Sequence, residues 1–356
     1  MAARDQFDTL APEFAIHING SPLPNEAVAD MISINVVEDL DATSMCTVTL
    51  SGWDTVEMKV KWIDHKLFRE GNPIKIEMGY RDHLQLVFSG EITGLEPDFP
   101  EARPAIFTVR AYDRRHRLMR QRKTQSFTNL KDSDIAGQLG HQAGLDPKVE
   151  DSKVKLPYVL QHNQTDLEFL LWRAQRIDYE VVVEDRTLLF RPRKIEKTAK
   201  LTLRRDIELL EFRPRMTTMG QVEEFTVRGW NAKEKKEIVA HSTAGDLSTV
   251  MGGTASGPAN VQQVFAKTGS TLVTVPVQSQ EEADRIAKQR FSEIALGYVR
   301  AEGKCIGDPQ LRAGIVVKIE GVGERFSGLY YVRAVEHRYS MQKGYRTAFS
   351  ARRNAT

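Results

Sequence analysis

The sequence predicts a mainly β protein with α+β insertions: two duplicated small β-barrel domains, a middle α+β domain and a helix-containing insertion in the last barrel. Apolar and polar residues alternate along both ends of the chain, which is the period of a half-buried strand. Helical spacing and N-terminal capping residues concentrate in two internal stretches. Short sequences near the start recur in the same order near the end, as expected after a duplication.

Residues 1–115 are predicted to form the first barrel domain. Alternating apolar residues mark about six short strands separated by turns, which is typical of a small barrel or a sandwich. Residues 56–69 between two of these strands are expected to form a short helix. Glu96 and Asp98 flank Pro97 and are expected in a turn.

Residues 116–200 change character and are predicted to form a compact α+β domain. Acidic and hydroxyl residues open a helix at 132–144, and Gly144 ends it. Thr165 and Glu168 stand three residues apart as a capping box for a second helix. Two strands then follow between residues 179 and 190.

The remaining chain returns to strand alternation and holds one insertion. Residues 252–258 are rich in glycine and small polar residues, so they are expected to form a mobile loop. Ser279 and Glu282 form another capping box, for a helix that ends at Gly297. The predicted ranges are the start of the second barrel at 201–235, the insertion at 236–297 and the rest of the barrel at 298–356.

Short sequence matches that recur in the same order indicate that the first and last domains are copies. Chance would supply any one short match, whereas three matches in one order favour duplication. The matching segments are 75–77, 88–90 and 107–110 in the first domain and 318–320, 326–328 and 345–350 in the last.

Composition excludes several classes of protein. The 356 residues are 41% hydrophobic and 28% charged, which excludes a disordered chain. A formal net charge of +2 gives no global field for nucleic acid. Cys46 and Cys305 are expected to be free and buried. Residues 1–8 lack the apolar core of a secretory signal, and no stretch reaches the roughly 20 apolar residues of a membrane span.

No pattern of catalytic, cofactor-binding or metal-ligating residues emerges. The eight histidines are scattered, and a nucleophile elbow, a phosphate-binding P-loop and a dinucleotide fingerprint are absent. We therefore predict no enzyme, no cofactor and no metal. The basic run at 114–123 is expected to be a solvated or subunit-facing surface, with phosphate contact as the alternative.

Three stretches together resemble the phage late control protein D family, the baseplate hub proteins of contractile tails. This family is similar to the N-terminal hub part of the valine-glycine-repeat (VgrG) spike proteins. The order and spacing of the stretches are specific, although no single one is decisive. They are residues 88–93 through 109–118 with 128–135, residues 161–170 through 173–174 to the strand at 179, and residues 303–309 with 328–332 and 344–347.

The resemblance implies a non-enzymatic homotrimer whose duplicated barrels form a pseudo-six-membered ring. Such a hub is a symmetry adaptor, with a hexameric inner tube protein above, a separate trimeric spike protein below and other baseplate proteins around it. Nucleic acid and membrane are not expected as partners. The chain would be made in the cytoplasm and assembled into a virion tail or injection particle. A tail-associated cell-wall hydrolase and a nucleic-acid-binding module are the alternatives.

Overall fold

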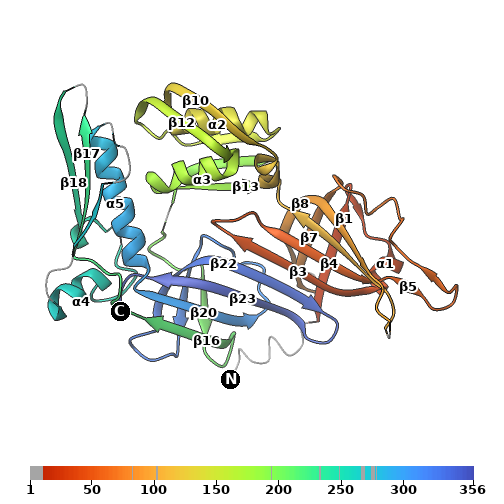
Figure 1. The fold of residues 1–356 in the computed structure, drawn as a ribbon. Coiled ribbons are helices and arrows are strands. Elements are labelled where there is room, and N and C mark those ends of the chain that lie inside the picture. The colour runs from red at the N-terminus through yellow and green to blue at the C-terminus, as the bar shows by residue number, and fades with distance from the viewer. Residues whose placement is uncertain are drawn as a thin grey trace.

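A computed structural model describes residues 11–356, apart from 82, 102, 194, 232–233, 248, 266–268, 274–276 and 278. Residues 1–8, which lack a signal-like apolar core, lie outside the described residues. The chain is mainly β with α+β insertions, as predicted. Figure 1 shows one long sheet along the base, with two smaller units standing above it.

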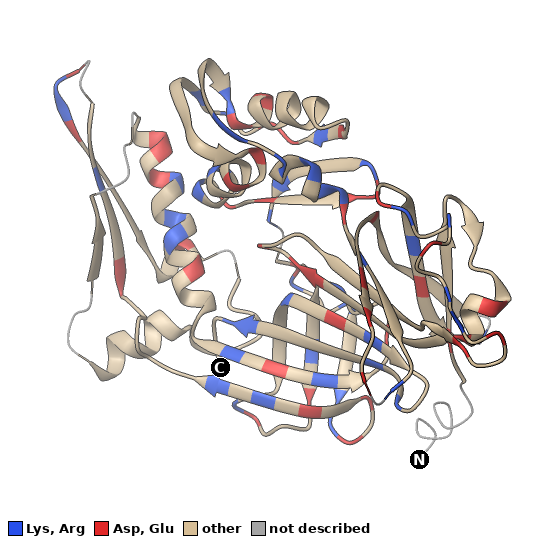
Figure 2. Ribbon diagram, turned by 45° about the vertical axis from the view of Figure 1, so that its right-hand side comes forward, with Lys and Arg blue, Asp and Glu red and all other residues tan. Residues whose placement is uncertain are grey.

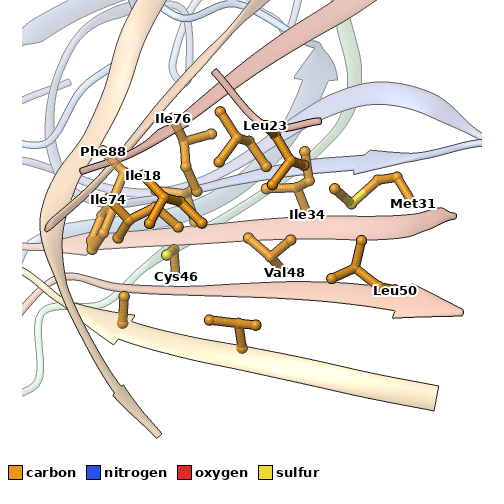
Figure 3. Close-up of a cluster of buried hydrophobic side chains, with 14 of the residues drawn as sticks. Ile18, Leu23, Met31, Ile34, Cys46, Val48, Leu50, Ile74, Ile76 and Phe88 are labelled. Carbon is orange, nitrogen blue, oxygen red and sulfur yellow. The ribbon is translucent and has the colours of Figure 1, made fainter. Parts of the chain in front are cut away.

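The first part of the sheet curls around an apolar core made by alternate residues of its strands. Figure 3 shows this core, in which Cys46 and Val48 face Ile34 and Ile76. We call this part the first strand set. Its six strands are β1 (Pro12–Ile18), β3 (Met31–Asp39), β4 (Met45–Ser51), β7 (Pro73–Tyr80), β8 (His83–Asp98) and β9 (Ile106–Tyr112).

Several short elements connect the strands of this first set. The helix predicted at residues 56–69 is not among them. Residues 56–69 form no helix; they complete a small hairpin and continue in turns. Here Asp54 accepts backbone N–H groups of Val56 and Glu57, which closes the hairpin turn. The short elements are β2 (Ser21–Pro22), α1 (Asn25–Ala29), β5 (Trp53–Asp54) and β6 (Lys59–Val60).

The last part of the chain supplies a second strand set, which surrounds a separate apolar core. Its strand β22 also pairs with β3, so the two predicted barrels are open parts of one continuous sheet. The six strands are β15 (Leu201–Arg204), β16 (Leu209–Met216), β20 (Val299–Ile306), β21 (Val316–Glu320), β22 (Gly328–Ser340) and β23 (Gly344–Arg353).

Both sets have the same strand order. Numbered along the chain within each set, the order across the sheet is 2-3-6-5-4-1 in each. In the first set this order is β3-β4-β9-β8-β7-β1, and in the second it is β16-β20-β23-β22-β21-β15. The one difference is that β1 runs antiparallel to β7 whereas β15 runs parallel to β21. Shared strand order supports duplication of one β-fold.

The β-bulges fall at matching positions, which aligns the two sets residue by residue. The β8·β9 register shifts between Ile92 and Gly94, and the β22·β23 register shifts between Val332 and Ala334. A second shift lies at the start of β3 and again at the start of β16. Bulges are specific features of a fold rather than defects. We call residues at matching positions counterparts.

A glycine pair gives the closest match. Gly71 and Gly314 both have φ +87°, a conformation that side chains disfavour. The Gly71 N–H donates to the Ile92 carbonyl at 2.8 Å, and the Gly314 N–H donates to the Val332 carbonyl at 2.9 Å. Ile92 and Val332 are counterparts, so the same glycine turn closes each set.

Of the repeated segments predicted to be equivalent, one pair occupies matching positions and another does not. Residues 75–77 and 318–320 are counterparts, because Pro73 and Val316 begin equivalent pairings with β8 and β22. Residues 88–90 and 326–328 are not counterparts: Phe88 pairs with Ile76 inside the ladder, whereas the later segment is a turn that enters β22.

The middle of the chain folds as the expected α+β unit, with its own apolar core. Thr165 and Glu168 make both halves of the predicted capping box, at 3.2 and 3.0 Å. Its elements are η1 (Arg114–Met119), β10 (Arg122–Lys131), α2 (Asp132–Gln142), β11 (Asp146–Val149), β12 (Lys155–Thr165), α3 (Asp166–Arg176), β13 (Tyr179–Glu184) and β14 (Thr187–Pro192).

The insertion lies between β16 and β20 and begins earlier than predicted. Strand β17 was expected in the second barrel, but it pairs with β18 and β19 because Phe225 and Val227 pack against α5. Within the described ranges no helix is long and apolar enough to cross a membrane. The elements are β17 (Glu224–Asn231), β18 (Lys236–Thr243), η2 (Ala244–Asp246), α4 (Gly257–Val264), β19 (Gly269–Leu272) and α5 (Gln280–Leu296).

The segment expected to be a mobile loop, residues 252–258, is anchored instead. The Gly257 N–H donates to the Asn354 carbonyl at 2.8 Å, and the Thr254 N–H donates to the Thr356 carbonyl at 3.0 Å. Ser256 then caps α4 by accepting from the Ala259 N–H. Backbone pairing with the C-terminus replaces the apolar anchor that the sequence lacks.

Candidate assembly surface

The two strand sets meet along β22 and β3, which we call the internal joint. Residues 334–340 of β22 pair antiparallel with residues 33–39 of β3, over seven residues on each strand. Strand β22 serves two roles along its length, because residues 328–331 pair with β21. The strand thus leaves its own set beyond the bulge and continues as the neighbour of the first.

Side chains of the second set complete the core of the first across this joint. Tyr345 is fully buried in the first core, with its ring centroid 6.1 Å from that of Tyr80. Its hydroxyl bonds His337 Nδ1 at 2.8 Å. Burial, and then the charge of Arg312, lowers the pKa of His337 to about 3. His337 is therefore a neutral structural residue of the joint.

An arginine fixes the joint from the loop after β20. Arg312 Nε donates to Glu38 Oε2 at 2.7 Å, and Arg312 Nη1 donates to the Leu86 carbonyl at 2.9 Å. A guanidinium that bonds a carboxylate and a carbonyl fixes orientation as well as distance. One residue of the second set thus holds two strands of the first.

Two other strands of the sheet, β8 and β16, each leave an open edge. Among the residues that the structure describes, β8 beyond its bulge pairs with β9 on one side only. Apart from a single bridge between Leu209 and Arg205, β16 pairs only with β20 in the same part of the chain. These are the counterparts of the two strands that pair in the internal joint. An open edge presents unpaired backbone groups to another strand.

Charged side chains lie on the outer face of both open edges. Glu96 accepts two hydrogen bonds from Arg110, at 2.7 and 3.0 Å. On the other edge Glu211 pairs with Lys304 at 3.1 Å and with Arg213 at 3.4 Å. Figure 2 shows acidic and basic bands alternating along the strands near the C-terminus. The turn predicted at residues 96–98 is wrong, because these residues continue β8.

The first part of the basic run at 114–123 is not the solvated surface predicted for it, whereas residues 119–122 are exposed. Its first part is buried, and Glu91 accepts hydrogen bonds from Arg114, His116 and Arg117. Burial alone would raise the pKa of Glu91, but hydrogen bonds from Arg117 and His116 and the arginine charges lower it to about 2. These residues join the first strand set to the middle unit, where Asp185 also accepts from Arg114.

A second ionic contact joins the middle unit to the insertion. The Glu282 carboxylate bonds Arg176 of α3 at 2.8 Å, and both side chains are buried. Ser279 still caps α5 by accepting from the Glu282 N–H at 3.2 Å. Only half of the predicted capping box therefore forms, because the glutamate side chain turns to the arginine.

Residues with catalytic or ligating chemistry are dispersed. Among the described residues no three His, Cys, Asp or Glu side chains gather as a metal site would require. Cys46 and Cys305 are free and buried, as predicted, and burial raises the pKa of both thiols.

The joint residues Arg312, His337 and Tyr345 were missed because each is an isolated polar or aromatic residue in a strand or loop. Only the register of β22 with β3 gives them a shared role. The one signal in the sequence was the duplication, which implies two equivalent strand sets that must meet somewhere along the chain.

One family model matches the chain, and several solved structures share its fold. The model of the family described as the Alg8 N-terminal domain matches residues 8–340. No curated protein sequence matches the chain.

Several solved structures share the fold at low identity. The 43 kDa tail protein of prophage MuSo2 from Shewanella oneidensis has a TM-score of 0.72 and 14% identity, over 96% of this chain and 98% of that one. A tail protein from Neisseria meningitidis MC58 has a TM-score of 0.69 and 11% identity, over 96% of each chain. The c3393 protein of E. coli, a type VI secretion component described as similar to bacteriophage T4 tail proteins, has a TM-score of 0.62 and 14% identity, over 96% of this chain and 77% of that one. The fold is thus that of phage tail proteins.

Proposed function

We infer that the chain, which belongs to the Alg8 N-terminal domain family, is a structural hub protein in the baseplate of a contractile tail or injection particle. As a homotrimer it would join a hexameric inner tube protein to a separate trimeric spike protein. Other baseplate proteins would surround it. The shared fold with tail proteins and a type VI secretion component supports this assignment.

The repeated strand set is the observation that carries the proposal. Two sets with one strand order and matching bulges lie side by side in each chain. Three chains then offer six near-equivalent strand sets to six tube subunits, while the true threefold axis suits a trimeric spike. A duplicated chain thus reconciles two symmetries with a single polypeptide.

The middle unit and the insertion are positioned to serve as outer attachments. In Figure 1 both rise from the same side of the sheet. We propose hub domains at residues 1–115, 201–235 and 298–356 and outer parts at 116–200 and 236–297, with β17 assigned to the outer insertion. The particle, rather than the cytoplasm where the chain is made, would be its working location.

The residues on which the two alternatives rested do not favour them. A hydrolase acid needs a raised pKa, whereas Arg110 lowers the pKa of Glu96, first through its hydrogen bonds and then through its charge. A nucleic-acid site needs free cations, whereas Arg114 and Arg117 bond Glu91. We therefore propose a non-enzymatic role.

Light scattering on the purified full chain tests this function. The proposal predicts a solution mass three times the 40.3 kDa of one chain. A monomer that clears peptidoglycan suspensions would overturn it in favour of the hydrolase. A monomer that shifts short DNA in a salt-dependent manner would overturn it in favour of the nucleic-acid module.

A further inference from the structure

We propose that β16 of one chain pairs antiparallel with residues 94–99 of a second copy, in the register of the internal joint. This external joint rests on the trimer proposed above and names the surfaces that form it. The two open edges are counterparts of β3 and β22, which pair within the chain. The occupant of each edge is therefore another copy of the same chain.

The internal joint dictates the register. Glu96 lies as far beyond the bulge of β8 as Glu336 lies beyond the bulge of β22. Arg215 likewise lies as far beyond the bulge of β16 as Val37 does in β3. Glu336 pairs with Val37 inside the chain. Glu96 of one copy therefore falls opposite Arg215 of the next.

This register matches charges on the outer face of the joint. It places Glu96 opposite Arg215 and Asp98 opposite Arg213, so that both pairs have opposite charge. All four residues are exposed in the single chain. Opposite charges directly across two strands stabilise the pairing, whereas like charges oppose it. A shift by one residue would move every side chain to the wrong face.

The other face becomes apolar along its whole length. Phe99 is 63% exposed in the single chain, which is unusual for a large aromatic residue at a strand end. Its counterpart Tyr339 is packed edge-on against Phe14, with ring centroids 4.8 Å apart. The facing residues in the external joint are Leu95 with Met216, Pro97 with Pro214, and Phe99 with Phe212.

The prolines explain how these edges stay unpaired with other strands. The Thr217 N–H donates to the Tyr298 carbonyl at 3.0 Å, so alternate residues of β16 face β20 and the Pro214 nitrogen lies on the open edge. Pro97 holds the corresponding position on β8. A proline has no N–H to donate, and prolines on edges discourage indiscriminate pairing. In the proposed register Pro97 and Pro214 face each other, so that pair makes no backbone hydrogen bond. The backbone bonds of the external joint therefore come from the flanking pairs, and side-chain complementarity selects the partner strand.

The geometry of the joint also favours a closed assembly. The contact is head-to-tail, because each chain offers β16 to one neighbour and β8 to the other. Head-to-tail contacts form a ring when the rotation closes and a filament when it does not. Since the external joint repeats the internal one, equal steps relate successive strand sets, and the proposed trimer closes when each step is one sixth of a turn.

A disulfide between neighbouring chains tests the register. In the internal joint the Leu40 N–H donates to the Arg333 carbonyl, which makes the pair at Glu336 a non-hydrogen-bonded one. The Cα atoms of such a pair are about 4.5 Å apart, within the range of a disulfide. The Glu96→Cys/Arg215→Cys variant should oxidise to covalent trimers.

A shifted pair is the matched control. Glu96→Cys/Arg213→Cys moves one cysteine two residues along β16, beyond the usual reach of a disulfide. It should give less than a tenth of the covalent product. The native Cys46 and Cys305 are buried and do not compete.

Charge reversal supplies a second readout. Arg215→Glu should weaken association by roughly fivefold at low salt, and Glu96→Arg in the same chain should restore it. The matched control is Arg228→Glu, on the exposed face of the insertion, which should leave association unchanged.

The outcomes separate this inference from the proposed function. A wild-type trimer that cross-links only in the shifted register, or in neither, overturns the external joint and leaves the hub intact. A wild-type monomer overturns the trimeric hub and the joint together. Cross-linking into open polymers supports the register and contradicts the closed trimer.

Discussion

At one register position the first strand set holds Glu91 and the second holds Tyr331. Both residues are buried and both face the unit that stands on their set, but their chemistry differs. Glu91 binds the arginines that lead into the middle unit. Tyr331 packs among apolar residues, including Leu296 at the end of α5. The duplicated scaffold therefore attaches different outer parts through one shared position.

In the cores of the two sets the backbone pairing is the same, whereas the side chains at equivalent positions differ. Val48 faces Val109 in the first set, whereas Gly303 faces Phe349 at the same positions in the second. A glycine beside a phenylalanine replaces two valines, so the volume of the pair is roughly kept. Backbone register persists because moving it would turn every side chain to the other face.

The largest expected loss of stability follows from removing the Glu91 charge, which is the ionic member of the Glu91–Tyr331 comparison. Glu91→Gln should lower the free energy of unfolding by about 3 kcal/mol at pH 7, because it leaves buried arginine charges without a carboxylate. Tyr331→Phe is the matched change in the second set, and its hydroxyl has no hydrogen-bond partner among the described residues. Denaturant titration should find the second variant within about 0.5 kcal/mol of wild type.

The Glu91→Gln and Tyr331→Phe variants should also differ in how their stability depends on acid pH. The folded pKa of Glu91 is lowered to about 2, so its stabilisation is complete above the ordinary pKa of about 4.3 and is lost as the pH falls from about 5 toward 2. Wild type and Tyr331→Phe should share this loss of stability. Glu91→Gln should lack it, and an equal acid dependence in all three would contradict the assigned role of Glu91.

A smaller effect tests the exchanged core pair. A side chain at Gly303 would place its Cβ 2.3 Å from the Phe349 ring, so Gly303→Val should cost about 2 kcal/mol. Adding Phe349→Val recreates the valine pair of the first set and should recover about 1 kcal/mol. Additive losses in the double variant would mean that the two positions are not equivalent to Val48 and Val109.

The smallest expected loss of stability comes from substituting the matched glycines, and it tests whether the two turns are alike. Gly71→Ala and Gly314→Ala each impose a side chain on φ +87° and should each cost about 1 kcal/mol. Neither added Cβ meets another atom closer than 3.5 Å, so the backbone sets the cost in both. Thermal unfolding that separates the two variants by more than about 1 kcal/mol would show that the turns are not alike.

Local patterns predicted the elements well, and long-range pairing limited the rest. Strand alternation, the Thr165 cap and the order of the repeated segments follow from neighbouring residues. The repeat at residues 88–90 misled because three identical letters occurred two positions out of register. No local pattern encodes contacts between distant segments. Such contacts determine which strand edges stay open, and they bring Glu91 to the arginines at the start of the basic run.

Electron microscopy of the purified full chain tests the central claim most directly, namely that the two strand sets alternate around a closed ring. The predicted result is a particle with threefold symmetry in which six similar sheets surround the axis, with the middle unit and the insertion outside. A single chain, a twofold dimer, or a threefold particle whose first and second sets lie at different radii would contradict it.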